Sequence, residues 1–327
     1  MATLKDVAKE TGLTVSTVSR VLNNRGYISS NTREKVYDAM KRLNYQPNEL
    51  ARSLSKQTTN TIGVIVPHID HPYFARLLSS LETAAYQNGY KLLLFNSRER
   101  DEKEDEYMEM CKASRVAGII LCSGSVETER FRDLNVPLVT IERFLEYGTS
   151  AVECDNRQGG RLAAQHLLEC GCTNVIYLSG ENAVSMPADD RALGFMELCG
   201  QEGLHCLDPG KEIDARLNAS LDYHAYIEKI LTEFPEIDGI FASSDVIAAQ
   251  VIQICSKRGI KIPEQIRLVG FDDSSIASLT TPGITTIRQP VREMAEMAVR
   301  MLIRAERKEI VPNRTTLPVT LIRRETT

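Results

Sequence analysis

Residues 3–22 carry the pattern of two short helices joined by a tight turn, and no other stretch constrains the fold of this chain as strongly. Thr3 and Asp6 have the spacing of a capping box, and Thr14 can cap the second helix. Gly12 tolerates the left-handed conformation that ends a helix abruptly. Apolar residues recur at helical spacing in both helices, namely Leu4, Val7 and Ala8, then Val18, Val21 and Leu22.

The opposite face of the second helix carries Val15, Ser16, Ser19 and Arg20 near its N-terminal half. A helix-turn-helix presents this end to base edges in a DNA groove. Residues 1–58 hold ten Lys and Arg against five Asp and Glu, whereas the rest of the chain holds 29 basic and 39 acidic residues. A basic module on an acidic body is typical of a nucleic-acid reader joined to a domain of another kind. Chance segregation of solvated charges is the alternative.

A third helix is predicted at residues 31–44, with basic side chains on its outer faces. Its apolar stripe consists of Val36, Ala39, Met40 and Leu43. Three helices of this size can close a small core, so residues 1–46 are predicted to form an all-α head. Such a head is marginally stable alone, which favours support from DNA or from a second copy.

Residues 47–60 form the next segment, in which Pro47 stops the third helix and Asn48 can cap a new one. The helical stretch that follows spans only about two turns, and a helix of that length is mostly unfolded in water. We interpret it as a hinge helix that forms when DNA and a second subunit give it a packing surface. Ala51 and Leu54 lie on its inner face. A polar linker with one stray helical turn is the alternative.

From residue 61 the pattern changes to short apolar strands that alternate with helices. The predicted strands are 61–67, 91–96, 117–123, 136–142, 174–180, 238–245 and 266–273, with a terminal β segment at 316–323. The predicted helices are 72–89, 101–114, 157–170, 189–202, 221–234, 244–258 and 290–306. Repeated βα units of this length indicate doubly wound parallel sheets. The strands are too many for one sheet, which predicts two lobes with a cleft between them.

Polar and aromatic side chains follow many of these strands, at the carboxyl ends where ligands bind in such sheets. The predicted effector-binding residues are Asp70, Tyr73, Phe74, Ser123, Glu142, Arg143, Arg191, Ser244, Asp272 and Gln289. Their carboxylates can accept bonds from sugar hydroxyls, Arg191 can donate, and the aromatic rings offer flat faces for stacking. Each residue also has a structural alternative, because an Asp at a strand end can cap a helix and the aromatic rings can belong to the core.

Eight cysteines are scattered without a CxxC pair, and the five histidines are not spaced near them as ligands. We therefore expect free thiols in a reducing cytoplasm, no metal site and no cofactor. No apolar run is long enough to span a bilayer, and Met1 leads into a capped helix rather than an export segment. A P-loop, a GxGxxG after the first strand and a GxSxG elbow are all missing, which disfavours an enzyme. A periplasmic transport receptor and an α/β enzyme are the alternatives to a DNA-binding regulator.

Motifs along the chain resemble the lactose-repressor/galactose-repressor (LacI/GalR) family of transcriptional regulators. They are LKDVAKETGLTVSTVSRVLN, TREKV and LNYQPNELARSL near the N-terminus, then TIGVIVP, FASSD, VGFDD and TTIRQP. The resemblance covers essentially the whole chain, and residues 89–110 look most like the sucrose-operon branch. It implies a helix-turn-helix head and, over residues 61–327, a two-lobed body similar to periplasmic sugar-binding proteins. The lobes are expected at about 61–158 plus 288–315 and about 159–287 plus 316–327.

The same resemblance implies a homodimer or higher oligomer that binds a pseudo-palindromic operator in double-stranded DNA. Such regulators are most often repressors, and their operator affinity responds to a small effector, here expected to be a sugar or sugar phosphate. Val15, Ser16 and Arg20 fall at base-reading positions, and Leu54 falls at the minor-groove wedge. The expected DNA contacts are Thr3, Val15, Ser16, Thr17, Ser19, Arg20, Asn23, Tyr45, Asn48, Ala51 and Leu54.

Two residues of the body depart from the family pattern. Ser244 stands before Asp245 where lactose-type members place an asparagine that contacts sugar, and Asp189 stands where some relatives carry arginine, which leaves Arg191 as the donor. Both departures concern the identity of the effector. Lobe closure on the effector is expected to change the pairing of the hinge helices. Whether this releases or recruits DNA depends on which state the ligand prefers.

The hinge interpretation predicts the effect of Leu54→Ala. A leucine pair wedged into a minor groove can kink the duplex, and alanine cannot fill that wedge. Specific operator binding should weaken in the variant while effector affinity stays nearly intact. Titration of operator DNA and of effector into both proteins would measure this, and equal operator affinity would contradict the wedge.

Overall fold

The computed structural model describes residues 2–22, 26–45, 59–123, 136–143, 145, 150–180, 186–207 and 220–327. The chain divides into two compact units, the head Met1–Thr59 and the body Asn60–Thr327. The predicted hinge helix, with Asn48, Ala51 and Leu54, lies outside the described residues, as does Asn23. Within the described parts, every helix is too short or too polar to span a lipid bilayer.

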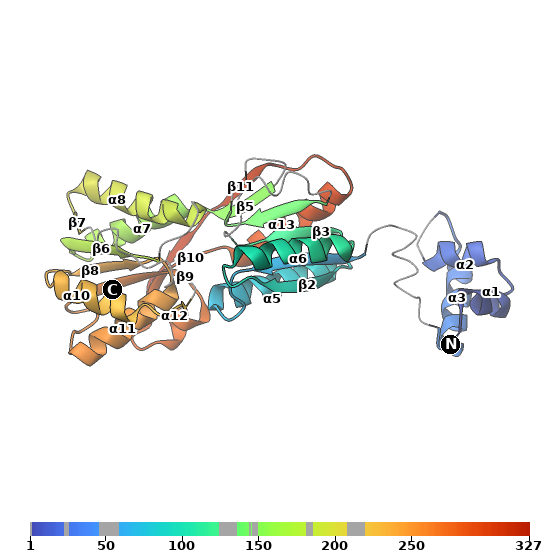
Figure 1. The fold of residues 1–327 in the computed structure, drawn as a ribbon, viewed down its shortest axis with the longest axis horizontal. Coiled ribbons are helices and arrows are strands. Elements are labelled where there is room, and N and C mark those ends of the chain that lie inside the picture. Colours follow the sequence, from blue (N-terminus) through green and yellow to red (C-terminus); the bar gives the residue numbers. More distant parts are fainter. Residues whose placement is uncertain are drawn as a thin grey trace. The chain divides into compact units, whose positions relative to one another are not determined.

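The described part of the head holds α1 (Leu4–Thr11), α2 (Val15–Leu22) and α3 (Ser30–Arg42), as Figure 1 shows. Side chains from all three helices form one core of Val7, Ala8, Val18, Val21, Val36 and Ala39. These are the stripes that the helical spacing indicated. The predicted helices of the head are thus confirmed.

Both predicted caps of the helix-turn-helix are present. The backbone N–H of Thr3 donates to Asp6 Oδ2 at 2.8 Å, and the N–H of Asp6 donates back to Thr3 Oγ1 at 3.4 Å. The N–H of Thr17 donates to Thr14 Oγ1 at 3.1 Å. Gly12 ends α1 at φ +67°, the left-handed conformation that glycine adopts without strain. These bonds satisfy backbone donors that a helix N-terminus otherwise leaves unpaired.

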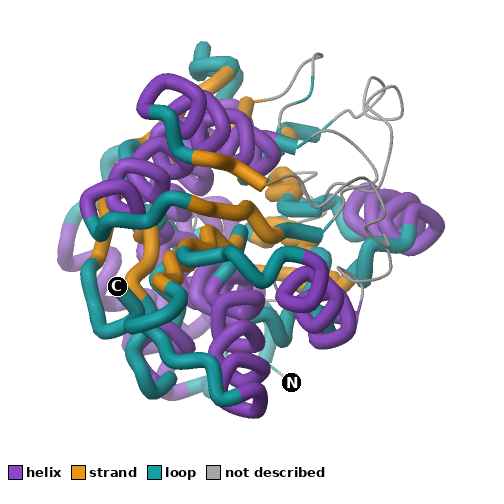
Figure 2. The backbone as a smooth tube through the Cα atoms, turned by 90° about the vertical axis from the view of Figure 1, so that its left-hand side faces the viewer, coloured by secondary structure: helices purple, strands orange, loops and turns teal. Residues whose placement is uncertain are grey.

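The body contains two six-stranded sheets with helices on their faces (Figures 1 and 2). The first runs in the order β11-β5-β4-β3-β1-β2, with all neighbours parallel. Its strands are β1 (Thr61–Val66), β2 (Lys91–Asn96), β3 (Gly118–Leu121), β4 (Leu138–Ile141), β5 (Ser150–Cys154) and β11 (Arg314–Leu317). Three helices pack on it, α5 (Pro72–Gln87), α6 (Asp101–Ala113) and α13 (Val291–Glu306). Together they form the first lobe.

The second sheet runs in the order β12-β10-β9-β8-β6-β7, and only its edge pair β10–β12 is antiparallel. Its strands are β6 (Asn174–Leu178), β7 (His205–Leu207), β8 (Gly239–Ala242), β9 (Arg267–Asp272), β10 (Thr285–Arg288) and β12 (Thr320–Ile322). The accompanying helices are α7 (Asn156–Glu169), the 3₁₀ turn η2 (Pro187–Asp189), α8 (Asp190–Glu202), α10 (His224–Glu233), α11 (Asp245–Arg258) and α12 (Ser275–Leu279). This is the second lobe, and the predicted doubly wound fold is confirmed.

The described chain passes between the lobes at Asp155, at Gln289–Pro290 and at Pro318–Val319. Two of these crossings are hydrogen-bonded to each other, because the N–H of Asp155 donates to the carbonyl of Leu317 at 2.8 Å. The first and third crossings therefore lie side by side, and we call them the seam. Residues beside it can contact both lobes at once.

Strands β10 and β5 and the short elements β7 and α12 are absent from the predicted elements. The sequence did not predict β10 because its buried residues include Thr285 and Thr286 rather than an apolar run. Their polar groups are satisfied inside the protein. The N–H of Thr285 donates to Thr326 Oγ1 at 2.8 Å, and Thr286 Oγ1 donates to Asp245 at 2.7 Å. A buried strand stabilised in this way has no apolar signature in the sequence.

Two glycines allow α7 and α8 to pack unusually close together. A Cβ added at Gly194 would overlap the carbonyl of Arg157, and one added at Gly160 would overlap the carbonyl of Arg191. Both obstacles are backbone atoms, which cannot rotate aside as a flexible side chain can. Glycine at these two positions therefore lets α8, the helix that carries Arg191, lie directly against the backbone of α7.

Gly194→Ala should destabilise the body by about 1–3 kcal/mol, because the added methyl forces the two helices apart. Gly200→Ala is the matched control in the same helix, since an added Cβ there meets nothing within 4 Å. It should be neutral or stabilising by up to about 1 kcal/mol, as alanine favours helix. Urea unfolding of both variants measures this, and equal stability of the two would contradict the close packing.

Candidate functional site

The exposed face of α2 carries the residues expected to read DNA bases. Val15 is 41% exposed, and Ser16 and Arg20 are also exposed. An exposed valine beside a hydroxyl and a guanidinium offers an apolar contact for a thymine methyl and donors for base edges. Ser19 is half-buried. The structure thus places these four side chains on or near one polar face.

Three other expected DNA contacts also have roles within the head. Thr3 Oγ1 donates to Asp6 at 2.8 Å, and the hydroxyls of Thr14 and Thr17 share a hydrogen bond of 2.8 Å. Tyr45 packs half-buried against the core of the head. Thr3, Thr17 and Tyr45 thus each have a contact within the head. Their contacts with DNA stay a prediction.

At the centre of the body, Asn156 joins a carboxylate of the first lobe to an arginine of the second. Its Nδ2 donates to Glu142 Oε2 at 2.8 Å, and its Oδ1 accepts from Arg191 Nε at 2.8 Å. Glu142 also accepts from the N–H of Cys154 at 2.6 Å, and its Oε2 lies 4.0 Å from the Arg191 guanidinium. We call this set, with Asp272, Gln289 and Tyr73, the central cluster.

Asp272 and Gln289 complete the central cluster from the second sheet and the second crossing. Gln289 Nε2 donates to Asp272 Oδ1 at 2.7 Å, and the Arg191 guanidinium lies over the Phe271 ring, 3.6 Å from its centroid. Two buried atoms, the Tyr73 hydroxyl oxygen and Gln289 Oε1, have no hydrogen-bond partner among the described residues. Buried polar atoms are normally satisfied, so these two point to a missing partner.

The central cluster is short of positive charge. Burial raises the pKa of Asp272 well above its usual value, and Arg191 opposes this only in part. Burial likewise raises the pKa of Glu142, again opposed by Arg191. The pKa of Tyr73 is raised well above its usual value by burial and then by the charge of Glu142. Two carboxylates thus compete for one guanidinium, and both gain from further hydrogen-bond donors.

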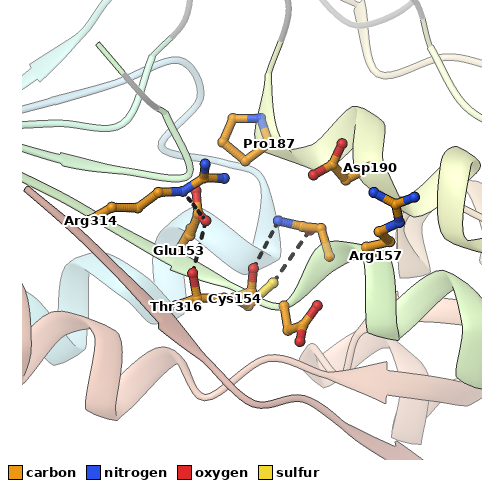
Figure 3. Close-up of a pocket in the computed structure, with 9 residues that line it drawn as sticks. Glu153, Cys154, Arg157, Pro187, Asp190, Arg314 and Thr316 are labelled. Atoms are coloured by element: carbon orange, nitrogen blue, oxygen red, sulfur yellow. Dashed lines mark hydrogen bonds and ion pairs between the residues drawn. The ribbon is translucent and has the colours of Figure 1, made fainter. Parts of the chain in front are cut away.

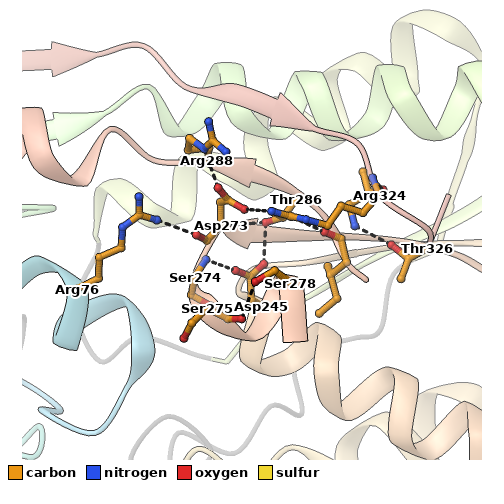
Figure 4. A network of polar contacts seen from close by, with 12 residues as sticks. Arg76, Asp245, Asp273, Ser274, Ser275, Ser278, Thr286, Arg288, Arg324 and Thr326 are labelled. Carbon is orange, nitrogen blue, oxygen red and sulfur yellow. Dashed lines mark hydrogen bonds and ion pairs between the residues drawn. The ribbon is translucent and has the colours of Figure 1, made fainter. Parts of the chain in front are cut away.

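A second polar network lies directly after Asp272 (Figure 4). Asp245 accepts from the N–H of Ser274 and from Thr286 Oγ1, each at 2.7 Å. The carboxylate of Asp273 accepts from Arg288 at 2.6 Å and from Arg324 at 2.5 Å. These bonds hold the chain where it leaves β9.

Arg76 connects this network to the first lobe. Its side chain extends from α5, and its NH1 donates to the backbone carbonyl of Asp273 at 2.8 Å (Figure 4). Asp272 and Asp273 have φ of +107° and +50°, which side-chain-bearing residues seldom adopt. This contact between the lobes, one of several, therefore rests on a strained segment that the surrounding bonds over-determine.

Two expected effector residues lie in a different cluster. Ser123 Oγ donates to Glu104 Oε1 at 2.8 Å, and Arg143 donates to the same oxygen at 3.2 Å and to the Ser123 carbonyl at 2.6 Å. All three residues are almost fully buried on the α6 side of the first sheet. The expectation that Ser123 and Arg143 gather with Arg191 is therefore corrected. A buried arginine needs this carboxylate partner.

The remaining expected residues lie near the site without joining the central cluster. Asp70 is exposed in the segment between β1 and α5. Phe74 is half-buried and lies edge-on to Tyr73, with ring centroids 5.1 Å apart. Ser244 Oγ accepts from the N–H of Ile247 at 3.3 Å and caps α11. His71, which sequence reasoning missed, caps α5, and burial lowers its pKa to about 4.

No group of His, Cys, Asp and Glu in the described residues is arranged to hold a metal ion. The described cysteines are all free thiols. Burial raises the pKa of most of those whose shift is resolved, for example that of Cys172 to about 12.

Two family models match the chain: bacterial regulatory proteins of the lacI family over residues 3–48, and the periplasmic binding protein-like domain over residues 164–327. The ribose operon repressor of Halalkalibacterium halodurans is 37% identical, covering 100% of this chain and 97% of the relative. The sucrose operon repressor of Pediococcus pentosaceus is 36% identical, covering 98% of each chain.

Two solved structures show the same fold. A periplasmic binding protein/LacI transcriptional regulator from Alkaliphilus metalliredigens, complexed with D-xylulofuranose, is 32% identical with a TM-score of 0.74. The match covers 82% of this chain and 99% of the chain in that structure. The lac repressor dimer bound to operator is 24% identical with a TM-score of 0.81, covering 99% of this chain and 98% of its own.

The Asp245 network predicts a pH dependence of stability. Burial raises the pKa of Asp245 to about 6, so the folded protein holds this proton more tightly than the unfolded chain. The resulting stabilisation is complete below a pH of about 4 and is lost as the pH rises through about 6, amounting to roughly 3 kcal/mol. In Asp245→Asn this contribution cannot titrate.

Urea unfolding of both proteins between pH 5 and pH 8 checks this. The stability of Asp245→Asn relative to the natural sequence should improve as the pH rises. A constant difference across that range would contradict the raised pKa.

Proposed function

The chain belongs to the LacI family of bacterial regulatory proteins, and from this premise we propose that its body binds a neutral sugar that controls operator binding by the head. The family resemblance inferred from the motifs is confirmed. Relatives that match over the full length are operon repressors and not enzymes, so the protein is a DNA-binding transcriptional repressor.

The observation that carries the sugar proposal is the pair of unpartnered atoms in the central cluster, the Tyr73 hydroxyl and Gln289 Oε1. A sugar hydroxyl is both donor and acceptor, so it can pair with each of them. Carboxylate oxygens accept more than one bond, which leaves capacity at Glu142 and Asp272. The face of the Phe74 ring suits stacking against a sugar ring.

The charges of the central cluster favour a neutral sugar over a sugar phosphate. Glu142 and Asp272 face one guanidinium, that of Arg191, whose Nε and NH1 also donate to Asn156 and to the Ser243 carbonyl. A phosphate dianion would add negative charge to a site that is already short of cations. The names of the relatives, which refer to ribose and sucrose, and the xylulofuranose complex support a carbohydrate.

Regulation follows from the position of the central cluster between the lobes. Glu142 and Tyr73 belong to the first lobe, whereas Arg191 and Asp272 belong to the second. A sugar that bonds to both sets favours one relative position of the lobes, and the Arg76 contact changes with it. A coupling of about 1–3 kcal/mol to the hinge is enough to change operator affinity usefully.

We propose that the protein acts as a dimer on a pseudo-palindromic operator, because one small head covers only one half-site. Leu94 on the edge strand β2 is 45% exposed, unlike the buried central strands, and is available to a second copy. The proposed DNA contacts are Thr3, Val15, Ser16, Thr17, Ser19, Arg20, Asn23, Tyr45, Asn48, Ala51 and Leu54. Operon repressors act on DNA in the cytoplasm, where we place this protein.

The test combines DNA retardation with sugar titration. The natural protein should retard promoter DNA that carries an inverted repeat, with salt-sensitive affinity. D-ribose or sucrose should change that affinity, whereas ribose 5-phosphate should act weakly. Asp272→Ala should keep basal DNA binding but need about tenfold or more sugar, because a hydrogen bond to a charged group is lost.

Asp222→Asn is the control for this test, since Asp222 is an exposed carboxylate whose partner is His224. It should respond like the natural protein. The proposal fails if a broad panel of sugars leaves operator affinity unchanged. An unchanged sugar titration in Asp272→Ala would remove that residue from the site.

A further inference from the structure

A pocket of about 340 Å³ opens beside the crossing seam (Figure 3). Its lining residues are Glu153, Cys154, Asp155, Asn156, Arg157, Pro187, Asp190, Arg314 and Thr316. None of the expected effector residues lines it. Its volume lies at the lower end of the range for small-molecule sites. The pocket is therefore distinct from the central cluster, although Asn156 belongs to the walls of both.

The pocket is built from both lobes. β5 and β11 of the first lobe contribute Glu153, Arg314 and Thr316, and the N-terminal ends of α7 and α8 contribute residues of the second lobe. Figure 3 shows Arg314 and Asp190 on opposite sides of it. Its shape therefore depends on how the lobes are positioned.

Glu153 is a buried carboxylate, and one of its two oxygens lacks a hydrogen-bond donor among the described residues. It is only 3% exposed, and its Oε1 accepts from Arg314 Nε at 2.6 Å and from Thr316 Oγ1 at 3.0 Å. Its Oε2 is buried without a hydrogen-bond partner among the described residues. A buried carboxylate that is only partly bonded is costly, and a nearby cation lowers that cost.

The remaining charges add to this deficit. Asp155 and Asp190 bring two further carboxylates to the pocket. Of the two arginines, Arg157 is bound through Nε and NH2 to Glu197, which does not line the pocket. The other, Arg314, is engaged by Glu153. The lining thus carries three carboxylates against two guanidinium groups, a formal excess of one negative charge, and Asp155 also caps α7 by accepting from the N–H of Gln158 at 2.9 Å.

We propose that this pocket is a second ligand site, which binds a small molecule carrying a protonated amine. An ammonium group supplies charge-assisted donors to the carboxylates of Glu153 and Asp190, which belong to different lobes. The bound amine thereby links the lobes at the seam. It acts on the central cluster through Asn156, which contacts both Glu142 and Arg191.

The test is calorimetric titration of the full chain with putrescine and with 1,4-butanediol, which has the same chain length but no charge. Putrescine should bind, more weakly at higher salt, and the diol should not. Glu153→Gln should weaken putrescine binding about tenfold or more, because a charge-assisted interaction is lost. Asp190→Asn, at the partly exposed edge of the pocket, should weaken binding in the same direction and serves if Glu153→Gln does not fold.

Glu236→Gln, an exposed residue of the second lobe, is the matched control and should bind putrescine like the natural protein. A change in putrescine affinity that is no larger in Glu153→Gln and Asp190→Asn than in Glu236→Gln would overturn the proposal. Equal binding of the diol, no binding of putrescine, or full binding by both pocket variants would also overturn it.

Discussion

The body depends on the buried guanidinium of Arg191. It is 7% exposed, lies over Phe271 and donates to Asn156 and to the Ser243 carbonyl. A buried charge is tolerated only when it is paired and fully hydrogen-bonded. Its carboxylate neighbours come from both lobes, Glu142 from the first and Asp272 from the second. The positive charge of Arg191 is thus balanced by carboxylates from both lobes. The relative position of the lobes is coupled to the electrostatics of the site for this reason.

The crossings give that coupling its mechanical basis. Asn156 follows the first crossing and Gln289 lies within the second, so both residues lie in segments that any lobe rotation must bend. Their side chains bond to Glu142 and Asp272 respectively. Residues that could act as hinges are therefore also residues that can contact a ligand. A small change in hydrogen bonding at the seam is enough to favour one lobe position, because packed interiors change between discrete arrangements.

Much of this site was predictable, since parallel strands gather their carboxyl ends at one edge of a sheet. Tyr73, Glu142 and Asp272 were expected on that basis. They meet in the central cluster with Arg191 and Gln289, which were also expected but follow no predicted strand. The neighbours that failed to join it did so for a geometric reason. β4 ends at Ile141, and Glu142 then adopts φ +54°, so the consecutive residues that follow the strand enter different clusters. Glu142 enters the central cluster, whereas Arg143 turns toward α6 and bonds to Glu104. Glu104 could not be singled out in the sequence because it lies among many charged residues of that helix.

At the end of β9, two consecutive residues likewise belong to two different networks. Asp272 faces the central cluster, whereas Asp273 faces the network of Arg288 and Arg324 and offers its carbonyl to Arg76. Both residues have positive φ, so neither can rotate without disturbing the bonds of the other. Such conformations cost about 1–3 kcal/mol each and persist only where neighbouring contacts hold them. That cost is comparable with the coupling free energy that an effector needs. A ligand that bonds to Asp272 would therefore act, through a single peptide unit, on the hydrogen bond between Arg76 and the Asp273 carbonyl.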